Sequence, residues 1–308
     1  MLMIDLKQRY LGSILGLACG DAIGGPVEFY RRGRFPEVTG MHGGGKFQLQ
    51  PGEWTDDTAM ALCLAESLLE CGGVDPLDQM QRYWRWANDG RHSTRPHAFG
   101  LGKTVAAALG RFRRTGQPLA GSSAPNSAGN GSLMRLAPIA LYFHSRPGEL
   151  LAAAELSSRT THAAETCLAS CRYLVAALHA ALAGAPDKDA VLAWASTLDL
   201  PDEMLRIRER RFQDADIATI SGSGYVVDSL EAALWCFWTT ESLEAAVLQA
   251  ANLGDDADTT AAICGQLAGA FYGAGAIPAP WLEALHYQDV LRSMAERLFE
   301  AVVVARNS

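Results

Sequence analysis

Residues 252–266 read NLGDDADTTAAICGQ and place Asp255, Asp256 and Asp258 at the head of an apolar segment rich in alanine. Apolar residues then return at three- and four-residue spacing, which predicts that a helix begins at these aspartates. No Lys, Arg or His occurs between residues 241 and 272, so no cation nearby in the sequence balances the three carboxylates. Either all three face water, or something outside this segment neutralises them.

A second acidic group lies near the other end of the chain, where residues 53–66 read EWTDDTAMALCLAE. Thr55, Asp56 and Asp57 open the helix predicted there. Capping is the ordinary explanation, because the helix dipole favours a carboxylate at an N-terminus by about 0.3–1 kcal/mol. A cap needs only one carboxylate, however, so capping alone leaves the additional charges unexplained.

If the two acidic groups converge in space, they form a site made of oxygen ligands alone. Its members would be Thr55, Asp56, Asp57, Asp256, Asp258 and Thr259. Mg²⁺ and Mn²⁺ prefer such ligands, whereas zinc prefers His or Cys, and neither acidic group contains one. Four carboxylates exceed the charge of one divalent ion, so we expect two Mg²⁺ ions, with Mn²⁺ as a substitute. A site with two metal ions suits hydrolysis of a polar, hydroxyl-rich substrate.

The periodicity along the whole chain predicts an all-α protein, without any alternating run long enough for a strand. The predicted helices cover residues 5–19, 56–71, 76–88, 103–115, 134–143, 148–160, 163–183, 188–197, 201–215, 227–238, 242–252, 256–272 and 280–304. No Pro- or Ser-rich linker separates two halves. We therefore expect one domain over residues 1–308, a compact orthogonal helical bundle.

Composition excludes several classes of function. The formal net charge of -8 and the lack of a basic stripe argue against nucleic acid as a partner. No stretch approaches the roughly 20 apolar residues that span a bilayer, so we expect no membrane association. The seven cysteines lie mostly in apolar runs and indicate reduced thiols in a cytoplasmic protein. The absence of heptads favours a monomer.

Two glycine-rich segments resemble phosphate-binding motifs but lack a required residue. FGLGKT at residues 99–104 would end a P-loop, yet the first glycine of that motif is replaced by His97. GNGSLM at residues 129–134 begins like G-x-G-x-x-G and ends in Met134. Neither supports a nucleotide kinase or a Rossmann enzyme. Glycine-rich loops of this kind can still bring backbone N–H groups close to an anion, or they can be simple turns.

Five motifs in order resemble those of the ADP-ribosylglycohydrolases. They are TDDT near residue 55, GNGSLMR at 129–135, TH at 161–162, SGSGYVVDSLEAALW at 221–235 and GDDADTTAA at 254–262, and together they span nearly the whole chain. The resemblance implies a compact all-α fold with a central cleft that holds two Mg²⁺ ions. It also implies hydrolysis of the bond between ADP-ribose and an acceptor, either a protein side chain or a small molecule.

The resemblance extends to individual positions. The six residues of the two acidic groups would be the metal ligands. Glu28 matches a glutamate on a mobile loop over the metals, although an acid beside two arginines is equally compatible with a plain surface position. The residues matching the diphosphate and ribose loop are Ser127, Gly129, Asn130, Gly131 and Ser132. His162 matches a residue beside the adenosine end, and Gly100 and Gly102 would offer backbone N–H groups to phosphate.

One departure from the pattern concerns the acceptor. Arginine-specific members often have F-D-I-G where this chain has Phe99-Gly100-Leu101-Gly102. The aspartate of that motif is absent here, and other members with G-x-G cleave serine-linked or ester-linked ADP-ribose. The sequence therefore leaves the acceptor linkage open.

The implied mechanism has the ribose hydroxyls bound at the metals, while Asp56, Asp57 or Glu28 takes the proton of the attacking water. Two alternatives remain. One is a catalytically silent protein that binds ADP-ribose, although all six ligand positions are retained. The other is a different Mg²⁺-dependent hydrolase, acting on nucleosides or phosphate esters.

Overall fold

A computed structural model describes residues 4–306 of the chain. Within that range the regular structure is helical, and strand-like pairing is limited to isolated bridges. The α-helices are α1 (Leu6–Gly24), α2 (Asp56–Cys71), α3 (Pro76–Asp89), α4 (Lys103–Thr115), α5 (Ala137–Tyr142), α6 (Pro147–Arg159), α7 (Glu165–Leu182), α8 (Lys188–Ala193), α9 (Leu205–Arg208), α10 (Val226–Thr239), α11 (Leu243–Ala251), α12 (Ala257–Tyr272), α13 (Ala279–Ala284) and α14 (Gln288–Arg306). Short 3₁₀ helices cover Gly25–Val27, Pro125–Ser127, Ala195–Thr197, Asp202–Met204, Arg211–Asp214, Ile217–Thr219 and Ala274–Ala276.

The prediction of an all-helical fold is confirmed. The bounds of α2 and α4 are those expected from the sequence, because each helix ends at a glycine in the left-handed conformation. Gly72 and Gly116 have φ of 73° and 70°, values that glycine adopts without a steric penalty. None of the helices within residues 4–306 combines the length and apolarity needed to cross a bilayer.

The predicted helices 280–304 and 201–215 are each broken into shorter elements. The segment 280–304 is divided into α13 and α14, because the backbone between them is held elsewhere. The His286 N–H donates to Gly52 O at 3.0 Å, and Trp54 Nε1 donates to His286 O at 3.0 Å. The segment 201–215 forms only short helical turns, interrupted at Arg210, whose φ is +54°.

Helix α1 is longer than predicted and continues past residue 19 to Gly24. Its glycines at four-residue spacing have a low helix propensity. They face α12, with which α1 makes its most extensive contact. A Cβ atom at Gly16 would lie 2.3 Å from Gly265 O, and one at Gly20 would lie 2.1 Å from Ala261 O. Glycine thus lets the two backbones touch, and the tertiary contact compensates for the weak propensity.

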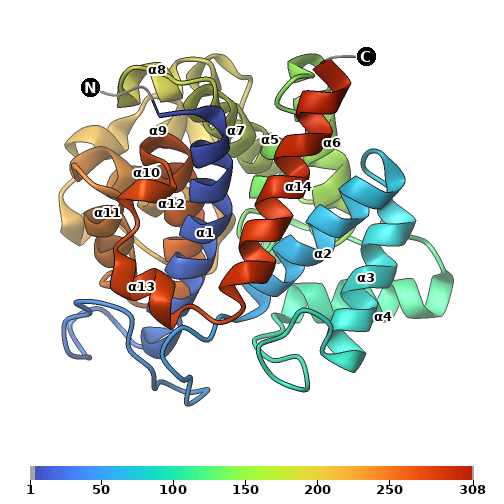
Figure 1. Cartoon of the computed structure of the whole chain (residues 1–308), viewed down its shortest axis with the longest axis horizontal. Coiled ribbons are helices and arrows are strands. Elements are labelled where there is room, and N and C mark those ends of the chain that lie inside the picture. Colours follow the sequence, from blue (N-terminus) through green and yellow to red (C-terminus); the bar gives the residue numbers. More distant parts are fainter. Residues whose placement is uncertain (1–3, 307–308) are drawn as a thin grey trace.

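The arrangement of the helices brings the two ends of the chain together. In Figure 1, α1 (blue) runs at the centre of the molecule beside α12 and α14 (orange to red). Because α1 also contacts α2, the amino ends of α2 and α12 meet near the carboxyl end of α1. The two acidic groups of the sequence lie at these helix ends.

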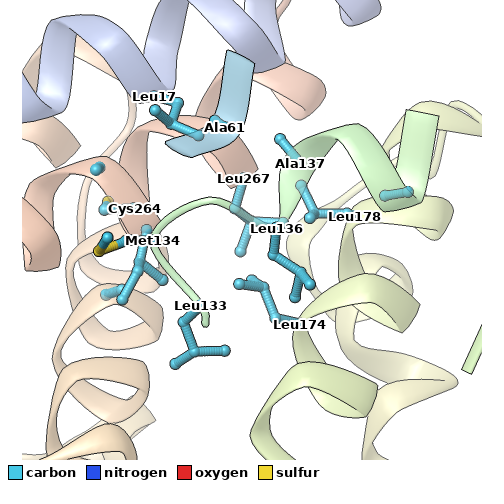
Figure 2. Packing of buried hydrophobic residues seen from close by; sticks show 14 of the residues in the cluster. Leu17, Ala61, Leu133, Met134, Leu136, Ala137, Leu174, Leu178, Cys264 and Leu267 are labelled. Atoms are coloured by element: carbon cyan, nitrogen blue, oxygen red, sulfur yellow. The ribbon is translucent and has the colours of Figure 1, made fainter. Parts of the chain in front are cut away.

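The segment that follows residues 129–132 is anchored in the hydrophobic core. Figure 2 shows Leu133, Leu136 and Ala137 among side chains from α7 and α12. Gln266 of α12 is fully buried, and its Nε2 donates to Leu133 O at 3.1 Å. Helix α12 therefore positions both an acidic group at its start and the glycine-rich loop beside it.

Candidate active site

Asp21, near the end of α1, holds the start of α2. Its carboxylate accepts the N–H of Thr55 at 2.8 Å, and it accepts the N–H and the hydroxyl of Thr58 at 3.0 and 2.6 Å. These bonds satisfy donors that a helix N-terminus leaves unpaired. Because α1 supplies the capping carboxylate, Asp56 and Asp57 are not needed as caps.

Carboxylate oxygens from three parts of the chain converge in two adjacent groups. In the first group, oxygens of Asp21, Asp57 and Asp258 lie within 4.8 Å of one another. In the second, oxygens of Glu28, Asp256 and Asp258 do so. Asp258 belongs to both groups, so the arrangement suits two neighbouring cations with one shared carboxylate.

Two oxygens of these groups are buried without a hydrogen-bond partner in the described part of the chain. They are Glu28 Oε2 and Asp57 Oδ1. The other oxygen of Asp57 accepts the Thr55 hydroxyl at 3.1 Å, so only Oδ1 is left open. A buried polar atom without a partner is costly, and a cation removes that cost. All the converging donors are oxygens, as hard divalent ions require.

Burial raises the pKa of every carboxyl in the two groups. It raises the pKa of Asp21 to about 6 and that of Glu28 to about 8. The pKa values of Asp57 and Asp258 lie well above the usual range, first because of burial and then because neighbouring carboxylates repel one another. The groups therefore cannot all be ionised near neutral pH unless a bound cation supplies positive charge.

A cleft of about 1010 Å³ opens above the carboxylates. Glu28, Asp56, Asp256 and Asp258 line one part of it, and two glycine-rich segments line another. These segments contribute Gly100, Leu101, Gly102, Gly129, Asn130 and Gly131, together with Lys103 and Thr104 at the start of α4, and His162 lies beside them. A cleft of this size accommodates a ligand as large as a nucleotide sugar.

The loop that carries Glu28 is joined to the start of α12 by backbone hydrogen bonds. Phe29 donates to Asp255 O, and Asp255 donates to Tyr30 O, both at 2.7 Å. Phe29 and Asp255 have φ of +70° and +56°, a conformation unusual for residues other than glycine. Asp255 is exposed and belongs to neither carboxylate group. This pairing holds Glu28 next to Asp256 and Asp258, the other members of the second group.

Asn130 connects the glycine-rich loop to the acidic centre. Its Nδ2 donates to Asp256 Oδ2 at 2.7 Å and to Ser229 Oγ at 2.8 Å. The bond fixes the orientation of the Asp256 carboxylate, as supporting groups around metal ligands commonly do.

His162 packs under the loop, closest to Gly131. A Cβ at Gly131 would lie 2.9 Å from Cε1 of the imidazole, and one at Gly129 would lie 3.4 Å from Nε2. Burial, together with the nearby Arg135, lowers the pKa of His162 to about 3. The imidazole is therefore neutral at the bottom of the cleft.

The structure brings most of the predicted site residues together. Those that line the cleft are Glu28, Asp56, Gly100, Gly102, Gly129, Asn130, Gly131, His162, Asp256, Asp258 and Thr259. Thr55 and Asp57 are buried beneath them. Ser127 and Ser132 are not among the lining residues: the Ser127 hydroxyl donates to Ala124 O at 2.6 Å, and the Ser132 hydroxyl accepts from Cys171 Sγ at 3.4 Å. The roles expected for these two serines stay predictions.

Asp21 is a site residue that sequence reasoning missed. The signal was present, since residues 17–25 read LACGDAIGG and set a single charge in an apolar run. A charge there must be buried once the segment is a core helix, and a buried charge needs a partner.

Comparison with known proteins assigns the chain and its fold to a family. A solved structure described as an ADP-ribosylglycohydrolase-related protein complex superposes with a TM-score of 0.86 at 45% identity, over 96% of this chain and 99% of that one. The family model for ADP-ribosylglycohydrolase matches residues 3–307. The chain belongs to the ADP-ribosylglycohydrolase family.

Two curated relatives illustrate the range of this ADP-ribosylglycohydrolase family. The ADP-ribosylarginine hydrolase Tri1 of Serratia proteamaculans is 40% identical, over 94% of this chain and 78% of the relative. The ADP-ribosyl-[dinitrogen reductase] glycohydrolase of Rhodospirillum rubrum is 34% identical over 91% of both chains. The predicted activity, hydrolysis of the bond between ADP-ribose and an acceptor, is confirmed by this membership. The acidic groups are consistent with the metal site expected of such an enzyme.

Proposed function

We propose that this ADP-ribosylglycohydrolase cleaves the N-glycosidic bond between ADP-ribose and an arginine side chain. The observation that carries the hydrolytic part of the proposal is the pair of carboxylate groups sharing Asp258, with open buried oxygens on Glu28 and Asp57, at the base of the cleft. Two divalent ions would be held there, Mg²⁺ by preference and Mn²⁺ as a substitute, since every donor is an oxygen.

The ligand set that we propose combines the six residues expected from the sequence with Asp21. Asp21, Asp57 and Asp258 would hold one ion, and Asp256 and Asp258 the other, with Glu28 above it. Thr55, Asp56 and Thr259 lie at the helix ends beside these carboxylates and would complete the two sites. When bound, the ions supply Lewis acidity to the reaction.

Arginine as the acceptor is supported by the relatives. Two that are 40% and 41% identical carry the name ADP-ribosylarginine hydrolase Tri1. The absence of the F-D-I-G aspartate at Gly100 has a steric reason of its own and is not an argument against this linkage. The φ of Gly100 is +81°, and a Cβ there would lie 2.4 Å from Asp56 Oδ1. The Asp56 carboxylate already occupies the space into which a residue-100 side chain would project.

The remaining steps, ligand binding and proton transfer, are assigned to residues of the cleft. Gly131 and the start of α4 would receive the diphosphate through backbone N–H groups, because the Gly129 N–H already donates to Ser127 O at 2.9 Å. Neutral His162 would lie beside the adenosine half. Glu28 or Asp56, which both line the cleft, or Asp57 below them, would take the proton of the attacking water. The same carboxylic acid can return the proton to the departing guanidine nitrogen.

Release of ADP-ribose from arginine-, serine- and ester-linked substrates, in Mg²⁺ and in EDTA, tests this proposal. We expect metal-dependent release from the arginine linkage. Release from a serine or ester linkage alone would overturn the arginine assignment. Tight binding of ADP-ribose without turnover would instead indicate a silent binder, and release of phosphate or free base would indicate another hydrolase.

A further inference from the structure

Arg135 is a buried cation for which the described part of the chain offers no carboxylate partner. It is 1% exposed and stacks on the ring of Tyr83, with its guanidinium carbon 4.7 Å from the ring centroid. The guanidinium donates to two neutral oxygens: Nη1 donates to Gly131 O at 2.8 Å, and Nη2 donates to Thr161 Oγ1 at 2.7 Å. A buried charge without an ion pair is expensive, so its place behind a loop of the cleft calls for a function.

The first hydrogen bond sets the direction of a peptide in the glycine-rich loop. Because that peptide is trans, the Ser132 N–H points away from the Gly131 carbonyl and therefore away from Arg135. Neither the Gly131 N–H nor the Ser132 N–H donates to a protein acceptor within residues 4–306. Two adjacent N–H groups without a protein acceptor can bind an anion, and Gly131 lines the cleft.

The second hydrogen bond fixes the tautomer of His162. A guanidinium can only donate, so Thr161 Oγ1 accepts from Arg135. The Thr161 hydroxyl proton is then free to donate to His162 Nδ1, which lies 2.8 Å away. With Nδ1 as an acceptor, the neutral ring carries its proton on Nε2, the atom that faces the glycine-rich loop.

We propose that Arg135 is a positioning residue for the diphosphate-bearing part of the ligand. Its guanidinium orients the Gly131–Ser132 peptide and, through Thr161, the His162 ring. Its uncompensated positive charge lies directly behind the loop and attracts the ligand's negative charge. This role rests on the proposed function, because it assumes that ADP-ribose occupies the cleft.

Calorimetric titration of ADP-ribose and of adenosine into wild type and Arg135→Met tests the role. We expect Arg135→Met to weaken ADP-ribose binding by about ten-fold or more, since charge-assisted contacts are stronger than neutral ones. Adenosine, which has no phosphate, should lose less than about three-fold. Arg135→Lys keeps the charge but not the fork-shaped donor, so its affinity for ADP-ribose should be intermediate.

Arg9→Met provides a matched control. Arg9 is another buried arginine that donates to carbonyls, those of Ala270 and Phe271 at 2.9 and 2.7 Å, and it does not line the cleft. Its substitution should lower stability without changing the affinity for ADP-ribose. An equal loss of ADP-ribose affinity in both variants would show that Arg135 is merely structural and would overturn the proposal.

The tautomer of His162, measured by nitrogen-15 NMR of the imidazoles, reports on the Thr161 hydrogen bond and not on the stability of the fold. Wild type should show His162 as the Nε2–H tautomer, and Thr161→Val should show a mixture. The Thr161→Val variant also decides the question if Arg135→Met fails to fold. An unchanged tautomer with unchanged ADP-ribose affinity in Thr161→Val would contradict the role. A wild-type protein that does not bind ADP-ribose would overturn the proposed function itself.

Discussion

At the scale of single residues, the acidic centre depends on where each carboxylate stands rather than on the total negative charge. Asp258 belongs to both carboxylate groups, and Asp57 to one, with one oxygen held by Thr55 and the other open. An amide at either position keeps the shape of the side chain but removes the charge that a cation needs. Such substitutions therefore test cation binding without changing the packing of the fold.

Asp57→Asn should lower turnover more than about 100-fold, because loss of a direct ligand should exceed the roughly 10- to 100-fold effect typical of supporting groups. The folded state should persist, since the variant relieves repulsion among buried carboxylates. Turnover and the thermal midpoint measured together test this. Asp189→Asn, at a position 70% exposed, is the control. Near-normal turnover in Asp57→Asn would exclude Asp57 as a ligand.

Gly100→Ala should displace Asp56 and reduce turnover about ten-fold or more. The new methyl would meet Asp56 Oδ1 at 2.4 Å in addition to the strain of a positive φ. Gly116→Ala is the matched control, because Gly116 has φ +70° but no atom within 4 Å of the position that a methyl would occupy. It shares the backbone strain without the contact. Equal turnover in the two variants would show that the approach of Gly100 to Asp56 has no catalytic consequence.

The acidic residues of the two helix starts could be identified from the sequence because they outnumber what capping needs. Asp21 could not be identified in that way. It lies inside a helix, and its importance comes from its contacts with Thr55 and Thr58, far away in the sequence. The same applies to Arg135, whose partners are a carbonyl and a hydroxyl that no pattern reveals.

At the scale of helices, the contact between α1 and α12 decides whether the site can form. Local signals were sufficient for α2 and α4, which end at left-handed glycines, but not for the end of α1. There, Gly20 and Gly24 look like helix breakers, and only the facing backbone of α12 explains why the helix continues. The break between α13 and α14 is likewise set by bonds to residues 52 and 54.

Gly20→Ala should destabilise the protein by more than about 3 kcal/mol, because overpacking against a rigid backbone exceeds the usual cost of added methyl groups. The added Cβ would lie 2.1 Å from Ala261 O. Since Asp21 is the next residue, metal affinity should fall as well. Gly148→Ala, in α6 with open space around the position, should leave stability unchanged or slightly higher. The free energies of unfolding of the two variants are compared by chemical denaturation. Equal values would contradict the tight contact between Gly20 and α12.

At the scale of the complete chain, the fold buries carboxyl groups that can all be ionised together only if a bound cation supplies positive charge. The folded-state pKa values of Asp21 and Glu28, about 6 and about 8, exceed those of unfolded carboxyls. Such groups add stability below their unfolded pKa, and that stability is lost as the pH rises through the folded values. In EDTA the thermal midpoint should therefore fall between about pH 5 and pH 8. Mg²⁺ should raise it most at the upper end, and a Mg²⁺ effect independent of pH would contradict this.

The number of Mn²⁺ ions bound per chain, measured for wild type and for Asp258→Asn, is the decisive test of the two-metal centre. We expect two ions for wild type, because two carboxylate groups share one residue. For Asp258→Asn we expect at most one weakly bound ion and no ADP-ribose release. Two ions bound by the variant with wild-type affinity, or none bound by the wild type, would contradict a two-metal hydrolytic centre built from both ends of the chain.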